Sequence, residues 1–220
     1  MSEPILILGS SGSGKSDACR ELDPAKTLLI SVDGKRFPFP MKEWPKLSSE
    51  NPSGSFYIPV TDQAGTSYDK TKRAMLAAVK NGKNKIVIDD SQFLISNQFF
   101  EKAFETGFQK FTDLGFAFWD LIRFSKTLPD DVIVYFLHHL EKEDGKIKVK
   151  TAGKMLDQQT CIEGKFTVCL LAEKIDGNYS FTSSLMNDPI AKAPRGMFEE
   201  KVMENNLANV DQCARDFWGM

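Results

Sequence analysis

The feature that most constrains this chain is a glycine-rich segment close to its start. Residues 9–16 read GSSGSGKS, with the spacing G-x-x-x-x-G-K-S, and they follow an apolar run at residues 5–8. An apolar run ended by Gly and Ser predicts a buried parallel strand, and we expect a helix from about residue 15 to residue 22. A Gly/Ser-rich linker would not be bracketed in this way. The segment therefore predicts a phosphate-binding loop between a strand and a helix.

The residue types in this loop suit a nucleoside triphosphate. Glycines allow backbone N–H groups to approach phosphate oxygens closely, and the N-terminus of the following helix adds a positive field. Lys15 can reach the β- and γ-phosphates, and the Ser16 hydroxyl can bind Mg²⁺. The predicted nucleotide-binding residues are Gly9, Ser10, Ser11, Gly12, Ser13, Gly14, Lys15, Ser16 and Asp17.

A pair of carboxylates follows another apolar run. The segment IVIDD at residues 86–90 predicts a buried strand that ends in Asp89 and Asp90. A phosphate-binding loop needs a carboxylate at the end of a neighbouring strand to hold Mg²⁺ through water, and Asp89 is the predicted metal-side acid. Asp90 is predicted to orient or deprotonate the attacking water. An ordinary turn or cap is the alternative for both residues.

The two histidines of the chain, His138 and His139, close the apolar strand predicted at residues 131–140. The carboxyl ends of strands in open α/β sheets face the ligand crevice. Because side chains alternate along a strand, only one of the two can point at the site. We expect one of them to sense the γ-phosphate, and His138 is the candidate catalytic residue, together with Lys15 and Asp90. The alternative is a pair of polar residues where a strand meets solvent.

Strands and helices alternate in the first part of the chain, and hairpin strands follow. This order predicts an α/β fold with a mostly parallel sheet and added antiparallel strands. We expect one domain over residues 1–220, with a long irregular excursion at about residues 33–67. The predicted strands are 4–8, 27–32, 56–60, 85–90, 131–140, 146–150, 165–172 and 179–184. The predicted helices are 15–22, 68–81, 97–124 (as one helix, or as two with a break near Gly115) and 198–218.

The charge balance excludes a global basic field for nucleic acid. The chain has 28 basic and 30 acidic residues and a net charge of -2. Nucleic-acid binding must therefore use a local patch. The alternating residues Lys146, Lys148 and Lys150, together with Lys154, are the candidate stripe for single-stranded DNA. A solvated strand face is the alternative.

Aromatic residues gather in two segments. Between residues 100 and 118 they recur at steps of three and four, which predicts a helical stripe that faces the core. Phe37, Phe39 and Trp44 lie in the Pro-rich excursion. These three can stack on nucleobases or pack on the domain.

Arginine usage separates the classes of phosphate-binding protein. A small-molecule kinase with a phosphate-binding loop usually has a lid with clustered arginines, whereas no two arginines lie close together here. A GTPase should show an N-K-x-D motif, and the segment NGKNK has no Asp at the required place. A motor-type ATPase takes a cationic finger from a neighbouring subunit, and Lys192 and Arg195 in AKAPRGMF are the candidates. A solvated loop is their alternative.

The cysteines and the hydropathy pattern predict a cytoplasmic protein without a membrane partner. The four cysteines show neither a C-x-x-C spacing nor a metal-binding pattern, so we expect reduced thiols. No apolar run approaches the roughly 20 residues of a membrane-spanning helix, and the first residues do not read as a signal peptide.

Several segments together resemble a known family. The segments ILGSSGSGKS, IVIDDSQFL, TAGKML, EGKFTV and AKAPRGMF resemble phage-encoded ATP-binding proteins with a minimal RecA-type core, short ATPases associated with single-strand annealing and recombination. The resemblance implies a RecA-like P-loop core in which residues 9–16 bind ATP and Asp89 serves Mg²⁺. It also implies that the strand ending in His138 and His139 carries a polar γ-phosphate sensor and leads into a DNA-contacting loop at residues 142–154.

The chain departs from the RecA-type pattern at the catalytic base. RecA-type enzymes carry a Glu after a central strand, whereas Asp33 follows TLLISV here, and Asp90 is the other candidate. A second departure is that we expect no N-terminal polymerisation segment of the kind found in full-length recombinases. The resemblance nevertheless leaves a ring or filament of identical subunits and a single-strand-binding protein as possible partners.

We therefore expect a Mg²⁺-dependent ATPase that acts on single-stranded DNA in phage recombination, annealing or replication, in the host-cell cytoplasm. The second hypothesis is a nucleotide-binding adaptor or loader that hydrolyses ATP poorly, because the catalytic Glu is missing. The third is a small-molecule kinase, which the sparse arginines disfavour.

Overall fold

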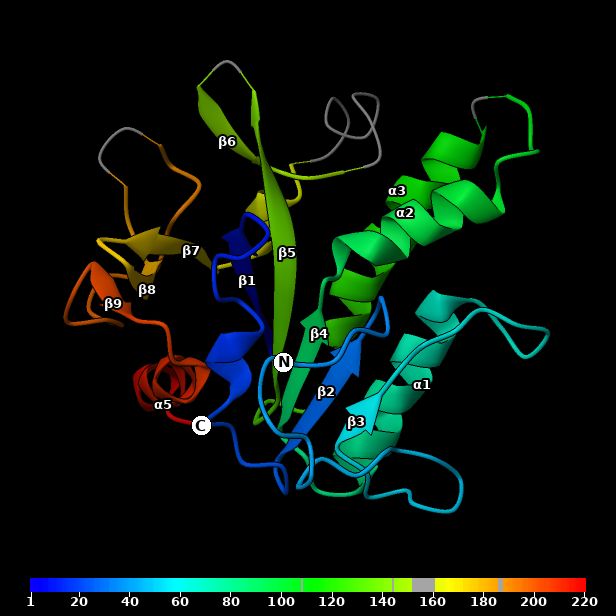
Figure 1. Cartoon of the computed structure of the whole chain (residues 1–220), viewed down its shortest axis with the longest axis horizontal. Helices are drawn as coiled ribbons and strands as arrows, with labels where there is room; N and C mark the ends of the chain where they lie inside the picture. The colour runs from blue at the N-terminus through cyan, green and yellow to red at the C-terminus, as the bar shows by residue number, and fades with distance from the viewer. Residues whose placement is uncertain (108, 144, 152–160, 186–187) are drawn as a thin grey trace.

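The structure of the chain, a computed structural model, describes residues 1–107, 109–143, 145–151, 161–185 and 188–220 (Figure 1). Its centre is a nine-stranded sheet in the order β3-β2-β4-β5-β1-β7-β8-β9, with β6 paired to β5 outside this path. The strands are β1 (Glu3–Gly9), β2 (Thr27–Ser31), β3 (Phe56–Tyr57), β4 (Lys85–Asp89), β5 (Ile133–Glu143), β6 (Lys146–Val149), β7 (Val168–Ile175), β8 (Asn178–Thr182) and β9 (Val202–Glu204).

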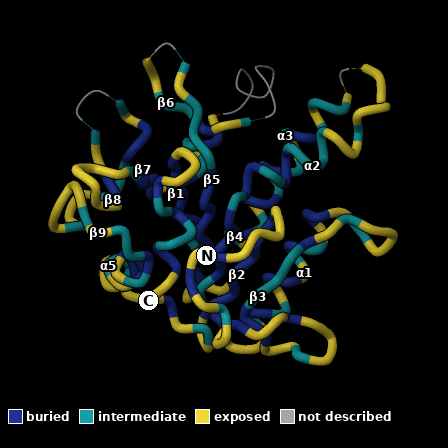
Figure 2. Tube along the Cα trace, viewed as in Figure 1, coloured by how far each residue is buried: buried dark blue, intermediate teal, exposed yellow. Residues whose placement is uncertain are grey.

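The sheet is parallel from β3 to β7 and antiparallel at β8, β9 and β6. This confirms the predicted α/β class with a mostly parallel sheet and a C-terminal hairpin. The parallel strands β1, β2 and β4 are buried along nearly their whole length, as the dark blue centre of Figure 2 shows. Strands covered on both faces need apolar residues at consecutive positions, which is why these segments read as unbroken apolar runs.

Helices cover the two faces of the sheet unequally. The helices α1 (Ser67–Lys80), α2 (Gln92–Glu101) and α3 (Gln109–Ser125) pack on one face, against side chains such as Leu6 and Ile88. On the other face, α5 (Leu207–Trp218) packs against side chains such as Ile5 and Val87. Figure 1 shows these two groups of helices on opposite sides of the central strands.

Aromatic residues of the excursion complete the second face. Phe37, Phe39 and Trp44 are 6%, 8% and 6% exposed and belong to the same core cluster as Ile5 and Leu207 of α5. Of the two possibilities for these residues, packing on the domain is therefore their main role. The excursion supplies the cover that a helix supplies elsewhere.

The helix expected at residues 15–22 does not form. Only a single 3₁₀ turn, η1 (Asp17–Cys19), follows the glycine-rich loop, held by bonds such as Arg20 N to Asp17 O. Two features explain this. The segment before Pro24 is too short for a stable helix, and the Ser16 hydroxyl bonds to Asp89 instead of capping the turn.

Two other helix predictions are corrected. Residues 97–124 form two helices, but the break lies after Glu101, and Gly115 is inside α3. The aromatic stripe is core at Phe118, which is 1% exposed, whereas Phe100 and Phe104 are 71% and 98% exposed. The tail is helical only from Leu207.

The start of α5 has a local cause. The side chain of Asn206 accepts hydrogen bonds from the backbone N–H groups of Ala208 and Asn209, which caps the helix at this point. Residues 202–204 before it pair with β8 as strand β9. The tail is therefore a strand followed by a helix.

A buried charge cluster fixes α5 to the sheet. The carboxylate of Asp211, a residue only 3% exposed, accepts hydrogen bonds from the Tyr135 hydroxyl (2.7 Å) and Arg215 Nε (2.8 Å). Lys85 Nζ lies 3.1 Å from the same carboxylate. Arg215 also donates to the backbone oxygens of Asp131 and Asn84. The cluster thus joins α5 to β4, β5 and the turns before them.

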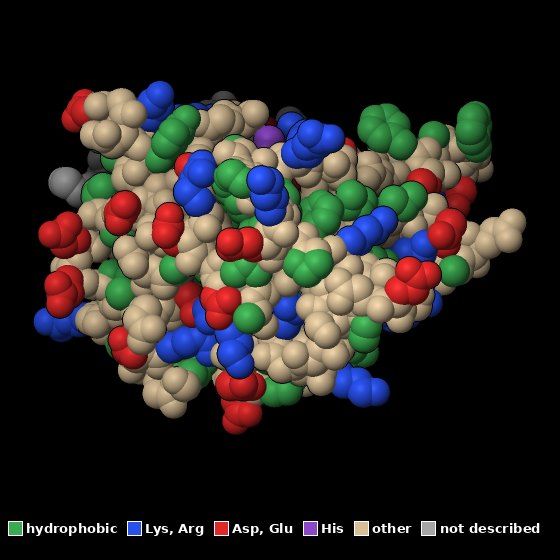
Figure 3. Space-filling view, turned by 60° about the horizontal axis from the view of Figure 1, so that its bottom comes forward, with side chains coloured by type: hydrophobic (Ala, Val, Ile, Leu, Met, Phe, Trp, Pro, Cys, Tyr) green, Lys and Arg blue, Asp and Glu red, His purple; other side chains and the backbone are tan. Residues whose placement is uncertain are grey.

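On the face seen in Figure 3, neither positive nor negative side chains predominate. In Figure 3, basic and acidic side chains are intermixed on the visible face, in keeping with the net charge of -2. Within the described residues, no helix combines the length and the apolar character needed to cross a membrane.

Candidate functional site

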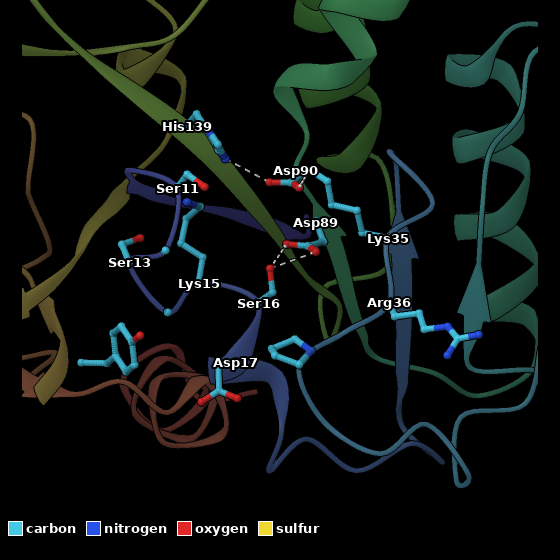
Figure 4. A pocket seen from close by; sticks show the side chains of 14 residues that line it. Ser11, Ser13, Lys15, Ser16, Asp17, Lys35, Arg36, Asp89, Asp90 and His139 are labelled. Carbon is cyan, nitrogen blue, oxygen red and sulfur yellow. Dashed lines mark hydrogen bonds and ion pairs between the residues drawn. The ribbon is translucent and has the colours of Figure 1, made fainter.

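A pocket of about 460 Å³ lies at the carboxyl ends of the parallel strands. The glycine-rich loop after β1 forms one wall, Asp89 and Asp90 at the end of β4 form another, and His139 of β5 lies between them (Figure 4). The pairing of Gly9 with His139 in the sheet sets this arrangement. The structure therefore brings together the loop and carboxylates that the sequence predicted as one site.

Two glycines of the loop occupy positions that no side chain can take. A Cβ atom on Gly9 would lie 2.3 Å from Ser13 Oγ and 2.8 Å from the backbone oxygen of Ala172. Gly14 has a φ of 89°, and its Cβ would lie 2.8 Å from the side chains of both Asn205 and Tyr179. The first and last glycines of the motif therefore allow the loop to fold tightly against β7, β8 and the segment after β9.

Lys15 lies across the inside of the loop. Its Nζ donates to the backbone oxygens of Gly9 (2.8 Å) and Ser10 (2.9 Å). Burial lowers its pKa to about 8, against the opposing effect of the charges of Asp90 and Asp89. The ammonium group is thus held in place while still mostly protonated at neutral pH, as a group that binds phosphate must be.

Ser16 and Asp89, the two residues predicted to bind Mg²⁺, contact each other. Ser16 Oγ donates to Asp89 Oδ1 (2.9 Å) and Oδ2 (3.1 Å), although the two residues are 73 positions apart. Burial, followed by the charge of Asp90, raises the pKa of Asp89 to about 7. Bringing a cation next to this carboxylate would favour its ionised form.

The donor set fits Mg²⁺ bound together with a triphosphate. The described residues contain no group of three or more His, Cys, Asp or Glu side chains able to hold a metal alone. Mg²⁺ usually takes one or two protein oxygens and completes its shell with phosphate oxygens and water, and Ser16 and Asp89 supply such oxygens. The Ser13 hydroxyl also lines the pocket and is buried, with no hydrogen-bond partner among the described residues. A phosphate oxygen would satisfy it.

Asp90 is held by two basic side chains. Its carboxylate lies 3.2 Å from His139 Nε2 and 3.3 Å from Lys35 Nζ. Partial burial alone would raise the pKa of Asp90, but the hydrogen bonds and charges of His139 and Lys35 lower it to about 2. So acidic a group is a weak proton acceptor. Of its two predicted roles, orienting water fits better than deprotonating it.

Side chains of neighbouring residues in a strand point to opposite faces, yet Asp89 and Asp90 line the same pocket. Asp90 has a φ of 56°, a left-handed conformation that non-glycine residues rarely adopt. Asp33, the other candidate base, pairs with Lys35 Nζ at 3.0 Å and does not line the pocket.

The histidine that faces the pocket is His139, so the choice of His138 does not fit the structure. His138 is fully buried, with its Nδ1 2.9 Å from Ser91 Oγ and its Nε2 2.7 Å from the backbone oxygen of Lys150. Because a carbonyl oxygen can only accept, Nε2 carries the proton and donates to it. His138 therefore links the start of α2 to the end of β6, behind the site.

We expect His138 to make stability depend on pH. Burial lowers its pKa from 6.5 to about 4, so the unfolded chain takes up this proton at a higher pH than the folded chain does. The stabilisation is complete above pH 6.5 and falls as the pH drops toward 4, by about 3 kcal/mol at most. Urea unfolding at pH 7 and pH 4.5 measures the fall, which should be smaller in His138→Gln.

The other histidine provides the control. His139→Gln retains the buried His138. Between pH 7 and pH 4.5, its free energy of unfolding should therefore fall as much as that of the parent protein. If the fall were equally large in His138→Gln, His138 would not be its source.

Lys35, Arg36 and Tyr179 also line the pocket and were not predicted. The adjacent cations at 35 and 36, shortly after a strand that ends at the same edge of the sheet, were an available signal. No signal in the sequence pointed to Tyr179, because its position depends on how β8 packs against the glycine-rich loop.

The remaining predicted residues lie elsewhere. Lys192 and Arg195 do not line the pocket, and the backbone of Lys192 pairs with Cys169. Lys146 and Lys150 are exposed on or next to β6, whereas Lys148 Nζ lies 2.6 Å from the carboxylate of Glu143. Lys154 is outside the described residues.

The basic stripe on β6 faces acidic neighbours. In the β5–β6 pairing, Glu143 and Glu141 stand opposite Lys146 and Lys148. These carboxylates offset part of the positive charge, which weakens the stripe as a site for DNA.

Comparison of the sequence with models of known protein families and with curated proteins gives no match. The chemistry of the pocket is therefore the basis for the function proposed next.

Proposed function

We propose that this protein is a Mg²⁺-dependent ATPase with a RecA-like core that acts on single-stranded DNA in phage recombination, annealing or replication. The observation that carries the proposal is the contact of Ser16 with Asp89 beside the Lys15 ammonium. A hydroxyl, a carboxylate and a cation at one phosphate-sized loop form the constellation needed for hydrolysis of a nucleoside triphosphate.

The sheet order supports the RecA-like part of the proposal. β5 lies between β1, which carries the loop, and β4, which carries Asp89. It places His139 beside the pocket and runs on into β6. The resemblance noted in the sequence implies a γ-phosphate sensor on this strand and a DNA-contacting loop after it. His139 takes the sensor position in this proposal.

The pocket residues divide the chemistry among them. Lys15 neutralises charge on the β- and γ-phosphates, and Tyr179 closes the side of the pocket next to Gly14. Ser16 and Asp89 would hold Mg²⁺, which supplies charge stabilisation when bound. Asp90, fixed by His139 and Lys35, accepts a hydrogen bond from the water that attacks the γ-phosphate in line with the leaving oxygen. A neighbouring subunit can add Lys192 or Arg195.

Asp89→Asn should lower the rate of ATP hydrolysis by about 100-fold, because asparagine keeps the shape but removes the charge that holds the cation. Hydrolysis is measured at saturating Mg²⁺, with and without an oligonucleotide of single-stranded DNA. The oligonucleotide should raise the rate of the parent protein.

The matched control is Asp130→Asn, a substitution of an exposed aspartate away from the pocket, which should leave the rate unchanged. Equal rates in Asp89→Asn and the parent protein would contradict the ATPase. A rate that single-stranded DNA leaves unaltered would contradict the DNA part of the proposal alone.

The second candidate function is a nucleotide-binding adaptor that hydrolyses ATP slowly. The observation that favours it is the lack of a strong carboxylate base in the pocket. The described lining includes no glutamate, and the pKa of Asp90 is only about 2. Tight ATP binding with negligible turnover, together with retention of a partner protein in a pull-down, would separate the adaptor from the ATPase.

A further inference from the structure

A second cavity, of about 550 Å³, lies next to the phosphate pocket. The excursion between β2 and β3 forms most of its lining, and Lys35 and Arg36 line both cavities. The phosphate-binding loop and the residues Asp89 and Asp90 do not line it. It is therefore a separate space that adjoins the phosphate pocket at Lys35 and Arg36.

Phe37, Phe39, Trp44 and Phe56 form one aromatic wall of this cavity. Phe37 packs against Phe39 and Phe56, with ring centroids 5.3 and 6.2 Å apart, and Phe39 packs against Trp44 at 6.2 Å. These rings are mostly buried against the sheet, so their positions are fixed before any ligand binds. A fixed aromatic wall favours a flat ring, because stacking then costs little side-chain ordering.

The rim of the cavity carries a cation with no partner. Lys35 is already paired with Asp33 and Asp90. Arg36 forms neither a hydrogen bond nor an ion pair within the described part of the chain. In Figure 4, its guanidinium group points away from Asp89 and Asp90. An unpaired guanidinium group beside an apolar cavity favours an anion that arrives attached to an apolar group.

We propose that this cavity binds one nucleotide unit, with the base against the aromatic wall and its phosphate on Arg36. A nucleoside monophosphate combines the flat ring and the phosphate that the two parts of the cavity require, and the volume is ample for it. Such a unit can come from a free mononucleotide or from a single strand.

Calorimetric titration of the full chain with dTMP tests the proposal. A non-hydrolysable ATP analogue fills the phosphate pocket first, and a parallel titration uses Lys15→Ala without the analogue. We expect one dTMP site per chain in both titrations. Arg36→Ala should weaken dTMP binding at least about tenfold, because a charge-assisted bidentate contact is lost.

Two further variants sharpen this test. Lys42→Ala removes an exposed cation of the same excursion that does not line the cavity, and it should bind dTMP like the parent protein. Phe39→Leu should weaken dTMP binding while the melting temperature confirms that the chain is folded. Thymidine, which lacks the phosphate, should bind more weakly than dTMP and should be insensitive to Arg36→Ala.

Oligothymidylate in place of dTMP distinguishes the two sources of the nucleotide. Binding of the oligonucleotide alone assigns the cavity to a strand, and binding of dTMP as well assigns it to the free nucleotide too. The proposal is overturned if neither ligand binds, if the ATP analogue displaces dTMP, or if Arg36→Ala binds like the parent protein. Because Lys15→Ala is titrated without the analogue, the result does not depend on ATP hydrolysis.

Discussion

Lys15→Ala should lower the rate of ATP hydrolysis by about 1,000-fold, the size of effect seen when one fixed electrostatic contact to a transition state is removed. Lys15 is 4% exposed, and its ammonium group is held inside the loop by the backbone oxygens of Gly9 and Ser10. A phosphate group would take over these hydrogen bonds. No other cation of the loop can replace it, since residues 9–16 contain one lysine and no arginine.

Hydrolysis is followed as phosphate release at saturating Mg²⁺, and ATP binding is measured separately. Lys42→Ala is the matched control, because it removes an exposed lysine outside the phosphate pocket and should have no effect. A turnover rate in Lys15→Ala close to that of the parent protein would mean that hydrolysis, if present, occurs elsewhere on the chain.

Asp211→Ala should lower the free energy of unfolding by about 3–5 kcal/mol, the usual cost of removing one partner from a buried ionic cluster. Asp211 is the one carboxylate in the described structure that pairs with Arg215 and Lys85, and it also accepts a hydrogen bond from Tyr135. Without it, buried positive charge remains with no counter-charge, and the Tyr135 hydroxyl loses its acceptor. Urea unfolding at pH 7 measures the change.

The control for this prediction lies on the same helix. Asp216 of α5 is exposed and accepts a hydrogen bond from Gln212, so Asp216→Ala should cost well under about 1 kcal/mol. If Asp211→Ala does not fold, Asp211→Asn, which still accepts the Tyr135 hydrogen bond, provides a milder measurement. Equal unfolding free energies for Asp211→Asn, Asp216→Ala and the parent protein would show that the cluster does not stabilise the fold.

The site was predictable where a short motif determines it. The spacing of residues 9–16 and the strand ending at Asp89 each specify their own local geometry, and parallel strands bring their carboxyl ends to one edge. The meeting of Ser16 and Asp89 follows from these two facts. The strands themselves were predictable because burial on both faces leaves unbroken apolar runs.

Some site residues were predicted wrongly or missed because their positions depend on pairing between distant segments. Whether His138 or His139 faces the pocket depends on the register of β5 against β1, and a shift of one residue exchanges them. The contact of Lys148 with Glu143 depends on the β5–β6 hairpin. Tyr179 and the Asp211 cluster likewise join segments whose approach no local pattern encodes.

The excursion at residues 33–67 has a consequence for how freely this chain can vary. Most loops accept insertions and deletions because little depends on their course. This one contributes the rings of Phe37, Phe39 and Trp44 to the core, and through Lys35 it also contacts Asp90. A change of its length near residue 36 would uncover the sheet and displace a charge at the pocket in a single step. We therefore expect related chains to keep the spacing between Lys35 and Trp44 even where the tip of the excursion differs.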